Sequence, residues 1–447
     1  MKFPDDFAFG VATAAYQIEG AASEDGRGPS IWDTFSHTPG KVRHGDTGDI
    51  ACDHYHRVEE DLDLLVHLGV NAYRFSVAWT RVIPDGRGPV NQKGLDFYRR
   101  LVEELRLRGV SPMATLYHWD LPQGLQDTGG WENRDTASRF AEYTSVVADE
   151  LGDVVDRWVT LNEPWCSAFV GHLEGRHAPG VANLTSALSA SHHLMLSHGL
   201  SVQALRAANV SGEVGITLNL SDVHAANEAG RPGASRIDGN ENRWFLDPIF
   251  RGSYPADMIS WYEQRADLSA IRPDDGVVIA QPLDFLGVNY YEQHQVVDDP
   301  AEPLHNARKL TPAPPITDSR IAVRSEGLAN ILRRLASDYT NLPLFVTENG
   351  AAYFDYATPE GTVDDIERCE YLEEHFAAVH DCIAAGVDIR GYYVWSFMDN
   401  FEWAEGYRLR FGIVHVDYPS QRRTVKASGE WYRALIASQE QTAALPS

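Results

Sequence analysis

Residues 72–119 contain AYRFSVAW (72–79), KGLDFYRRLVEELRLR (93–108) and SPMATLYHW (111–119), with Gly109 directly after the middle segment. The first and third segments are short and almost continuously apolar, which is typical of strands buried on both faces. The middle segment repeats apolar residues at helical spacing, and Gly109 fits the left-handed position that often ends a helix. A strand, a helix and a second strand in this order predict parallel strands joined by a crossover helix.

The same unit recurs along the chain. Eight short apolar runs that end in polar or aromatic residues lie at 7–20, 72–79, 111–119, 157–164, 213–220, 283–291, 344–350 and 389–399. Helical spacing is also found at 58–68, 136–151 and 368–385, followed by Gly69, Gly152 and Gly386. Eight units predict an α/β fold, a single (β/α)8 TIM barrel over residues 1–447 with its active site at the C-terminal ends of the strands. An open, doubly wound sheet is the alternative.

Two segments, 221–240 and 292–323, interrupt this repeat. The signals for strand and for helix both fade there. We therefore expect these segments to be the two longest loops of the barrel.

The composition is that of a globular protein with an acidic surface. The chain has 447 residues, 43% hydrophobic and 23% charged, so it can bury a large core without disulfide staples. Its 38 basic and 64 acidic side chains give a net charge of −26. A surface of this sign repels phosphate backbones and anionic lipids, so we expect no nucleic-acid partner and no membrane partner. The sequence predicts no particular oligomeric state.

The cysteines and the N-terminal residues indicate a cytoplasmic protein. The four cysteines are far apart and form no CxxC pair, so we expect all of them to be reduced: Cys52, Cys166, Cys369 and Cys382. The first residues lack a charged region followed by an apolar core, so they do not resemble a signal peptide. No run approaches the ~18 apolar residues that a membrane span needs.

Polar and aromatic residues gather where the apolar runs end. The candidate site residues are Gln17, Arg74, His118, Trp119, Asn162, Glu163, Asn289, Tyr291, Glu348, Trp395, Glu402 and Trp403. The carboxyl ends of barrel strands meet at one mouth, so we expect these side chains to share a site. A single buried polar residue can be explained as one that has found a hydrogen-bond partner. Polar residues that recur at equivalent positions of several strands indicate function.

Glu163 and Glu348 are the candidate reactive groups. They end the fourth and seventh runs, which can face each other across a ring of eight strands. The two carboxyls of such a pair can have different catalytic roles, with one protonated as a general acid and the other ionised as a nucleophile. The structural alternative for each residue is an ion pair with a nearby arginine.

Three tryptophans lie beside the polar strand ends, namely Trp119, Trp395 and Trp403. Sugars present flat C–H faces and rings of hydroxyl groups, so a sugar site needs an aromatic platform and several hydrogen-bond partners. The partners available here are Gln17, His118, Asn162 and Glu402. Core packing is the alternative explanation for any one tryptophan.

Two motifs, TLNEP at 160–164 and VTENG at 346–350, resemble the acid/base and nucleophile motifs of glycoside hydrolase family 1, the β-glucosidase family. Further matching segments are FAFGVATAAYQIEG, YRFSVAW, YHWDLP, GVNYY, and WSFMDNFEWAEGY followed by RFGIVHVDY. The resemblance runs in the same order from residue 7 to about residue 431 and so covers nearly the whole chain. No single motif decides it, but together the motifs are highly specific.

The resemblance implies a retaining β-glycosidase, and above all a β-glucosidase that removes terminal β-D-glucosyl residues through a covalent glycosyl-enzyme intermediate. Glu163 would be the general acid/base, Glu348 the nucleophile, and Asn162 the partner of the sugar 2-hydroxyl. Arg74 and Tyr291 would keep Glu348 ionised and oriented. β-Galactosidase or β-fucosidase specificity on the same mechanism stays open.

The resemblance also implies how the sugar is held. The outer hydroxyl groups would be bound by Gln17, His118, Trp119, Glu402 and Trp403. Trp395 would be the stacking floor, and Asn289 would support the acid/base side. The implied partners are small-molecule β-glucosides and short β-linked oligosaccharides, with a role in cellulose degradation. We expect no cofactor and no metal.

The two glutamates need different pKa values for these roles. An ordinary glutamate titrates near ~4.3, so Glu163 needs a rise of roughly 2 units, or about 2.7 kcal/mol, to donate a proton near neutral pH. The charge of Glu348 supplies part of that rise. Once Glu348 is a neutral ester, Glu163 becomes acidic enough to act as the base of the second step.

Three features separate the chain from particular relatives. Members that act on phosphorylated sugars carry a serine and a lysine after the last strand, whereas this chain reads EWAE at 402–405, which implies unphosphorylated sugars. Plant thioglucosidases lack the acid/base glutamate, so Glu163 implies O-glycosides. Many bacterial members read roughly TDMGWEV where this chain reads TDSRIAV at 317–323. Ile321 thus replaces the usual tryptophan, and we expect an altered leaving-group side.

Two other classes of protein compete with this interpretation. A metal-dependent barrel hydrolase could use His54 and His56, but this pair precedes the helix predicted at 58–68 and does not end a strand. A non-catalytic sugar-binding barrel needs the aromatic platform but not both glutamates. The presence of Glu163 and Glu348 disfavours that class.

Overall fold

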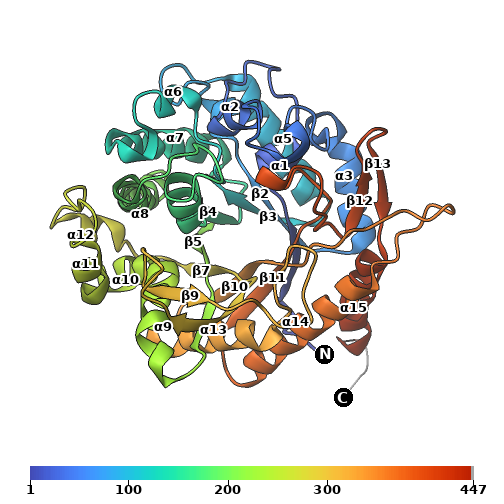
Figure 1. Cartoon of the computed structure of the whole chain (residues 1–447). Coiled ribbons are helices and arrows are strands. Elements are labelled where there is room, and N and C mark those ends of the chain that lie inside the picture. The colour runs from blue at the N-terminus through green and yellow to red at the C-terminus, as the bar shows by residue number, and fades with distance from the viewer. Residues whose placement is uncertain (444–447) are drawn as a thin grey trace.

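The computed structural model describes residues 1–443, and its centre is a closed ring of eight parallel strands (Figure 1). The strands are β1 (Ala8–Ala12), β2 (Ala72–Ser76), β3 (Ser111–Thr115), β4 (Arg157–Asn162), β5 (Glu213–Asn219), β7 (Phe285–Asn289), β10 (Leu344–Asn349) and β11 (Ile389–Trp395). Their order around the ring is β1-β11-β10-β7-β5-β4-β3-β2. Because β11 pairs with β1, the barrel is confirmed and the open sheet is wrong.

Each of the eight apolar runs contains one of these strands. In β2 every residue is buried, and Ala72 pairs with Ser111 of β3 in the same register that joins Arg74 to Met113. The strands end earlier than the apolar runs do, since the chain bends at the mouth of the barrel. The difference between apolar run and strand is largest for the first run, because part of its end forms the helical turn α1 (Ala15–Ile18).

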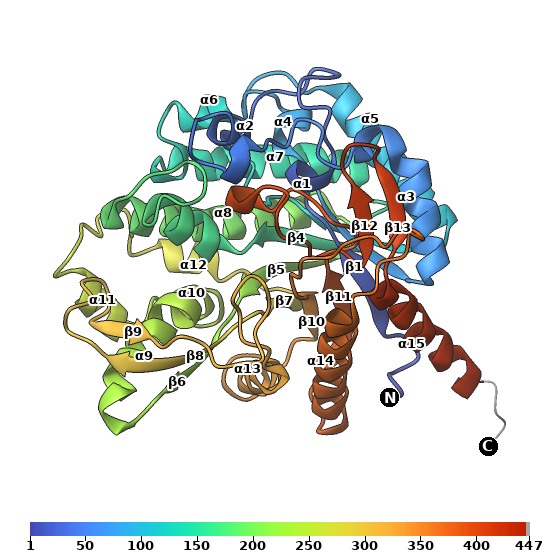
Figure 2. The ribbon, with the colours of Figure 1, turned by 45° about the vertical axis from the view of Figure 1, so that its right-hand side comes forward.

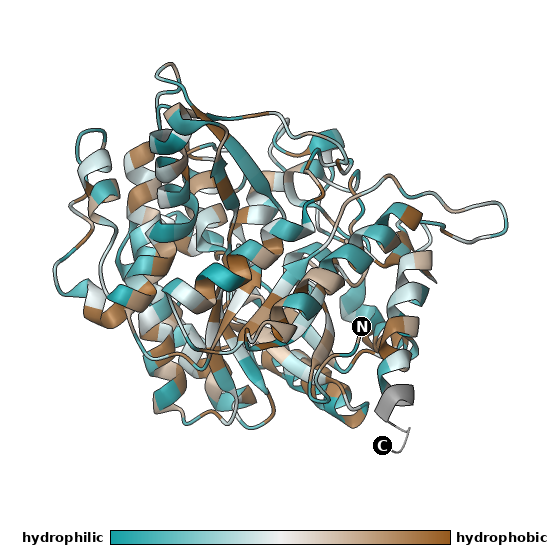
Figure 3. Cartoon of the chain, turned by 90° about the horizontal axis from the view of Figure 1, so that it is seen from below, coloured by the Kyte–Doolittle hydropathy of each residue, from teal (hydrophilic) through white to brown (hydrophobic). Residues whose placement is uncertain are grey.

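Amphipathic helices surround the ring, and their ribbons carry both hydrophilic and hydrophobic residues (Figure 3). The longer ones are α3 (His54–Leu68), α5 (Gln92–Leu107), α7 (Asp135–Leu151), α8 (Leu184–Ala207), α13 (Ser325–Asp338), α14 (Ile366–Ala384) and α15 (Ala427–Ala443). In α5 the buried face includes Leu101 and Leu105, as the spacing predicts. None of the helices within residues 1–443 is long and apolar enough to cross a membrane.

The predicted glycine stops are confirmed at three of four helices. Gly69, Gly109 and Gly386 have φ of 73°, 73° and 93°, in the left-handed region. Gly152 does not, and that prediction is wrong: its φ is −63° and its N–H still donates to Ala148 O. A Cβ at Gly152 would lie 2.4 Å from Ala148 O, so glycine is required there for space.

The two predicted loops are wrong in part, because they contain a small second sheet. Its strands are β6 (Asp222–Ala225), β8 (Gln293–Asp298) and β9 (Ala307–Lys309), in the order β6-β8-β9, and α9 (Arg231–Asp238) packs against it. These strands are short and partly exposed, so they lack the continuous apolar pattern of the barrel strands. Figure 2 shows this sheet and α9 outside the barrel, close to β7.

Shorter elements complete the chain. They are α2 (Ile31–Ser36), α4 (Trp79–Val82), α6 (Gln123–Gln126), α10 (Trp244–Arg251), α11 (Ala256–Tyr262), α12 (Asp275–Ile279), the hairpin β12 (Val414–Asp417) and β13 (Arg422–Val425), the π-helical turns η3 (Cys166–Val170) and η5 (Gly239–Arg243), and the 3-10 turns η1 (Arg43–Gly45), η2 (Gly130–Glu132), η4 (Glu228–Gly230) and η6 (Trp403–Glu405). The N-terminal segment contacts α15, since Phe3 N–H donates to Gln439 Oε1 at 3.0 Å. All four cysteines are free thiols, as expected.

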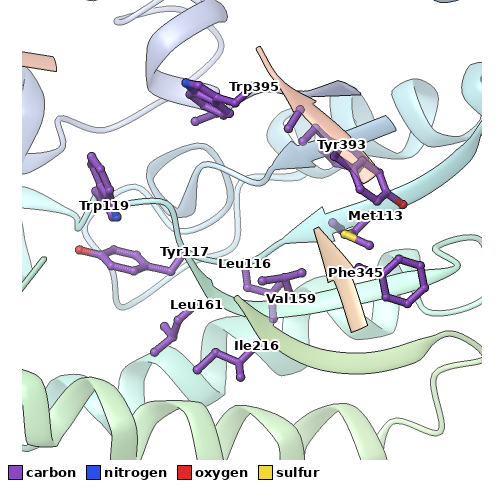
Figure 4. Packing of buried hydrophobic residues seen from close by; sticks show 14 of the residues in the cluster. Met113, Leu116, Tyr117, Trp119, Val159, Leu161, Ile216, Phe345, Tyr393 and Trp395 are labelled. Atoms are coloured by element: carbon purple, nitrogen blue, oxygen red, sulfur yellow. The ribbon is translucent and has the colours of Figure 1, made fainter. Parts of the chain in front are cut away.

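The barrel is filled by side chains and is therefore not a pore. Figure 4 shows Met113, Phe345 and Tyr393 packed at one end of the buried group, with Trp119 and Trp395 at the other. The filled interior seals one side of the mouth, so the polar groups at the strand ends face a pocket with a firm floor.

Candidate active site

A pocket with a volume of about 340 Å³ lies at the carboxyl ends of the strands. Nine of the twelve predicted residues line it, namely His118, Trp119, Glu163, Asn289, Tyr291, Glu348, Trp395, Glu402 and Trp403. The other three, Gln17, Arg74 and Asn162, are completely buried. Arg74 and Asn162 hydrogen-bond to lining residues, so the fold brings the predicted set together.

Glu348, at the end of β10, is surrounded by donors. Arg74 Nη1 lies 2.5 Å from its Oε1, and Tyr291 Oη donates to its Oε2 at 2.9 Å. Burial raises the pKa of Glu348, while the Arg74 charge and the Tyr291 hydroxyl oppose that rise. The ion pair with arginine that was the structural alternative is thus present, but it lies inside the pocket. It favours the ionised carboxylate at that position.

Glu163 follows β4 and has different neighbours. Asn289 Nδ2 donates to its Oε1 at 2.7 Å, and the thiol of Cys166 lies 3.2 Å from its Oε2. Within residues 1–443 no cation forms an ion pair with this carboxyl. Burial raises the pKa of Glu163 to about 8, and the charge of Glu348 adds to the rise. Of the two glutamates, Glu163 is therefore the one that keeps its proton near neutral pH.

A chain of amides connects the two carboxyls. Asn162 Oδ1 accepts from Arg74 Nη2 at 2.7 Å and from Asn289 Nδ2 at 3.1 Å. Asn162 Nδ2 donates to His118 Nε2 at 3.0 Å and keeps a second N–H, which is available to a ligand. The amide is held by three neighbours and cannot turn without breaking them.

Among the described residues, three buried polar atoms of the predicted sugar-binding residues have no hydrogen-bond partner. They are Gln17 Oε1, His118 Nδ1 and Glu402 Oε2. Buried polar groups in proteins are nearly always paired, so these atoms indicate that a polar ligand completes them. Burial and then the Arg74 charge hold the pKa of His118 well below its ordinary value. The ring is therefore neutral, and because Nε2 accepts from Asn162, Nδ1 is left as the donor.

Glu402 has a shifted pKa of its own. Burial raises it to about 8, and the charges of Glu348 and then Glu163 add to the rise. A protonated Glu402 donates as well as accepts, which suits a hydroxyl group that does both. Gln17 lies beside it, with Nε2 donating to Asn400 Oδ1 at 3.0 Å and to Phe401 O at 2.9 Å.

The three tryptophans form the walls of the pocket. The rings of Trp119 and Trp403 are 4.6 Å apart between centroids, and Trp395 stacks on His118 at 5.8 Å. The indole N–H of Trp119 already donates to Asn162 O at 3.1 Å, so this residue offers its ring and not its donor. Trp119, Glu163 and Trp403 have positive φ values of 79°, 46° and 49°. Such backbone strain is typical of functional sites.

Sequence reasoning missed several residues of the pocket. Cys166, Trp165 and Phe411 line it, although none was predicted as a site residue; Phe411 lies within the quoted segment RFGIVHVDY, and the other two lie outside the quoted motifs. Four further charged residues line the pocket. Glu241 lies in η5, Glu292 directly precedes β8, His294 lies in β8 and Lys309 lies in β9. Glu292, His294 and Lys309 lie in the second segment predicted as a loop, 292–323, and Glu241 directly follows the first, 221–240. Ile321, expected on the leaving-group side, lies in the wall as well.

The histidines considered as metal ligands have other partners. His54 Nδ1 lies 2.7 Å from Asp61 inside α3, and His56 is an exposed residue that pairs with Asp53 and Glu24. Within residues 1–443 no group of three or more His, Cys, Asp or Glu residues is placed to hold a metal ion.

Comparison with known proteins identifies the family. The model of glycosyl hydrolase family 1 matches residues 1–441. The thermostable β-glucosidase B of Thermobispora bispora is 51% identical, over 98% of this chain and 91% of its own. A bifunctional β-D-glucosidase/β-D-fucosidase of Bifidobacterium breve is 47% identical over 98% of each chain. A β-glucosidase from Thermotoga maritima, solved with deoxynojirimycin, has a TM-score of 0.94 and 45% identity, covering 98% of this chain and 99% of that one.

The chain belongs to glycosyl hydrolase family 1. It is a glycoside hydrolase that acts on O-glycosyl bonds, and the prediction of a retaining β-glucosidase is confirmed. The metal-dependent hydrolase and the non-catalytic sugar-binding barrel are therefore wrong as classes for this protein.

Proposed function

We propose that this β-glucosidase works by double displacement, with Glu348 as the nucleophile and Glu163 as the general acid/base. The observation that carries the proposal is the unequal setting of two buried carboxyls on one pocket. Glu348 is held by a cation and a hydroxyl donor, whereas Glu163 is held by a neutral amide and a thiol. One is thereby kept ionised and the other protonated, as a retaining mechanism requires.

In the first step a Glu348 carboxylate oxygen attacks the anomeric carbon. The bond from that carbon to the leaving-group oxygen breaks, and the Glu163 proton moves to this oxygen. The remaining N–H of Asn162 donates to the sugar 2-hydroxyl. Arg74 loses its ionic partner, since Glu348 is now a neutral ester, and the pKa of Glu163 falls because the neighbouring charge is gone.

In the second step Glu163 removes a proton from water, and the water oxygen attacks the anomeric carbon. The ester bond breaks and its electron pair returns to Glu348 as carboxylate. Two inversions give net retention. In the free enzyme Glu163 must be protonated, so kcat/KM falls as pH rises through about 8.

The terminal sugar is proposed to be glucose, bound by the unpartnered atoms of Gln17, His118 and Glu402 and stacked on Trp395. A β-fucosidase or β-galactosidase activity on the same residues is a second candidate. The similarity to the bifunctional enzyme of Bifidobacterium breve favours it. The proposed substrates are small β-glucosides and short β-linked oligosaccharides, including those released in cellulose degradation.

We further propose that residues 1–447 form one catalytic domain, of which 444–447 lie outside the described residues. A net charge of −26 supports the absence of nucleic-acid and membrane partners. The four free cysteines support a cytoplasmic location.

The assignment of Glu163 is tested with Glu163→Ala. An aryl β-glucoside with a good leaving group needs no proton, so its first step continues, while poor leaving groups lose about 10²–10⁴-fold in rate. Azide can then enter from the face that Glu163 vacates and give a β-glucosyl azide, identified by NMR. An α-glucosyl azide from this variant would mean that the two roles are reversed.

A further inference from the structure

The catalytic pair divides the barrel mouth into two arcs. Glu163 follows β4 and Glu348 ends β10, and these strands are separated by β5 and β7 on one side and by β3, β2, β1 and β11 on the other. The sugar arc, as we call the second group, carries Gln17, His118 and Glu402. The leaving-group arc comprises β5, β7 and the segments inserted after them (Figure 2).

The leaving-group arc carries a compact group of charges. We call Glu241, Glu292, His294 and Lys309 the leaving-group cluster, and all four line the same pocket as the catalytic pair. Lys309 Nζ lies 2.6 Å from Glu241 Oε1 and 2.8 Å from His294 Nε2. His294 Nε2 is 3.1 Å from Glu292 Oε2 and 3.4 Å from Glu241 Oε2.

One atom of this cluster is left without a hydrogen bond. Glu241 is 5% exposed, and its Oε2 makes no hydrogen bond of normal geometry among the described residues, keeping only the 3.4 Å charge contact with His294 Nε2. Burial by itself would raise the pKa of Glu241, but Lys309 and His294 bring it well below its usual range. Glu241 is thus an ionised, buried acceptor on the pocket wall with unused bonding capacity.

We propose that the leaving-group cluster binds the hydroxyl groups of an uncharged second sugar unit, so that β-linked disaccharides are preferred over glucosides with apolar leaving groups. The inference rests on the proposed function of the same site. A hydroxylated ring replaces the water around Glu241 and Lys309 with new hydrogen bonds. An apolar ring displaces that water and leaves both charges unsolvated, which a buried polar site does not tolerate.

The test compares kcat/KM for cellobiose with kcat/KM for cyclohexyl β-glucoside. The ratio is measured in the wild type and in the double variant Glu241→Leu with Lys309→Met. Comparison between variants cancels the intrinsic reactivity of the two leaving groups. We expect the ratio to fall about tenfold or more, since one hydrogen bond to a charged group is lost for cellobiose and the desolvation cost is removed for cyclohexyl.

Glu241→Gln serves as the second variant if the double variant does not fold. It keeps the size and one acceptor but removes the charge, and we expect the ratio to fall by a smaller factor. The matched control is Lys93→Met, which breaks the exposed 2.8 Å ion pair with Asp25 and removes the same charge far from the pocket. This control should leave the ratio unchanged.

The measurements distinguish a failure of the proposed function from a failure of the proposed role of the leaving-group cluster. No wild-type activity on an aryl β-glucoside would refute the proposed function itself. Normal aryl activity together with an unchanged or increased ratio in both Glu241 variants would refute only the role of the leaving-group cluster.

Discussion

The two arcs of the mouth hold their polar groups in different ways. On the sugar arc, His118 is neutral and Glu402 has a pKa raised to about 8, and each has a buried atom without a partner. On the leaving-group arc, Glu241 and Lys309 are charged and already paired at 2.6 Å. Glu241 Oε2 also lacks a hydrogen bond, so a ligand can complete atoms on both arcs, but on the second arc it binds beside groups that are already held in ion pairs. We therefore expect the terminal sugar to be selected more strongly than the leaving group.

The arcs also differ in the secondary structure that carries their residues. The sugar-arc residues Gln17, His118 and Glu402 follow strands of the closed barrel within seven positions. The leaving-group cluster is carried by η5 and by the small sheet of β8 and β9, which lies outside the barrel. Changes in that sheet can alter the leaving-group side without disturbing the strands that carry the catalytic pair.

The largest expected effect is at the border between the arcs. Glu348→Gly removes the proposed nucleophile and should lower kcat about 10⁵-fold for every leaving group, because both proposed steps pass through this residue. The glycine leaves space for azide, which should restore turnover of an activated aryl glucoside. The product should be an α-glucosyl azide, formed by a single inversion and identified by NMR.

The outcome that contradicts this is equally clear. If Glu348→Gly with azide gave the β-glucosyl azide, the attack would come from the Glu163 side. The division of the mouth at these two residues would then be wrong.

A smaller effect is expected within the sugar arc. Glu402→Ala leaves sugar hydroxyls unpaired, and kcat/KM should fall about a hundredfold or more. The fall should be the same for disaccharides and for aryl glucosides, in contrast with the leaving-group cluster. Glu405→Ala is the control, since Glu405 is a nearby carboxylate that pairs with Arg408 at 2.8 Å and faces solvent. A fall that depends on the leaving group would erase the distinction between the arcs.

The smallest effect concerns the thiol beside the acid/base. The Cys166 hydrogen bond lowers the pKa of Glu163, so Cys166→Ala should raise that pKa. Since Glu163 must be protonated, the alkaline limb of the kcat/KM profile should move to higher pH by a fraction of a unit. Cys166→Ser keeps a donor and should keep the limb near its wild-type position. Movement of the limb to lower pH would show that the thiol has a different role.

The sequence was sufficient to predict the barrel, and to predict that the candidate residues of the sugar arc gather at its mouth, for a physical reason. Strands buried on both faces need continuous apolar runs, and a polar residue at the end of such a run has few explanations besides function. Glu163 and Glu348 were recognisable because each directly follows or ends such a run. His118 and Trp119 follow β3 in the same way.

The leaving-group cluster could not be predicted by that logic. Glu241, His294 and Lys309 lie far apart in the chain. His294 and Lys309 meet through the pairing of β8 with β9, and Glu241 reaches both of them from η5. Those strands are short and partly exposed, so neither their existence nor their pairing leaves a periodic signal. The prediction of a left-handed Gly152 was wrong because a glycine in the sequence has two explanations. Close packing, here against Ala148, requires glycine as much as a left-handed turn does.

The central claim, that Glu348 forms a covalent bond with the sugar, is tested directly by trapping. A 2-deoxy-2-fluoro-β-glucoside with a good leaving group slows both steps because fluorine destabilises the developing positive charge, and the good leaving group lets the first step finish. Peptide mass spectrometry should then find a fluoroglucosyl group on Glu348 and on no other residue. A label on Glu163, or no label while the substrate is turned over with inversion, would contradict the account.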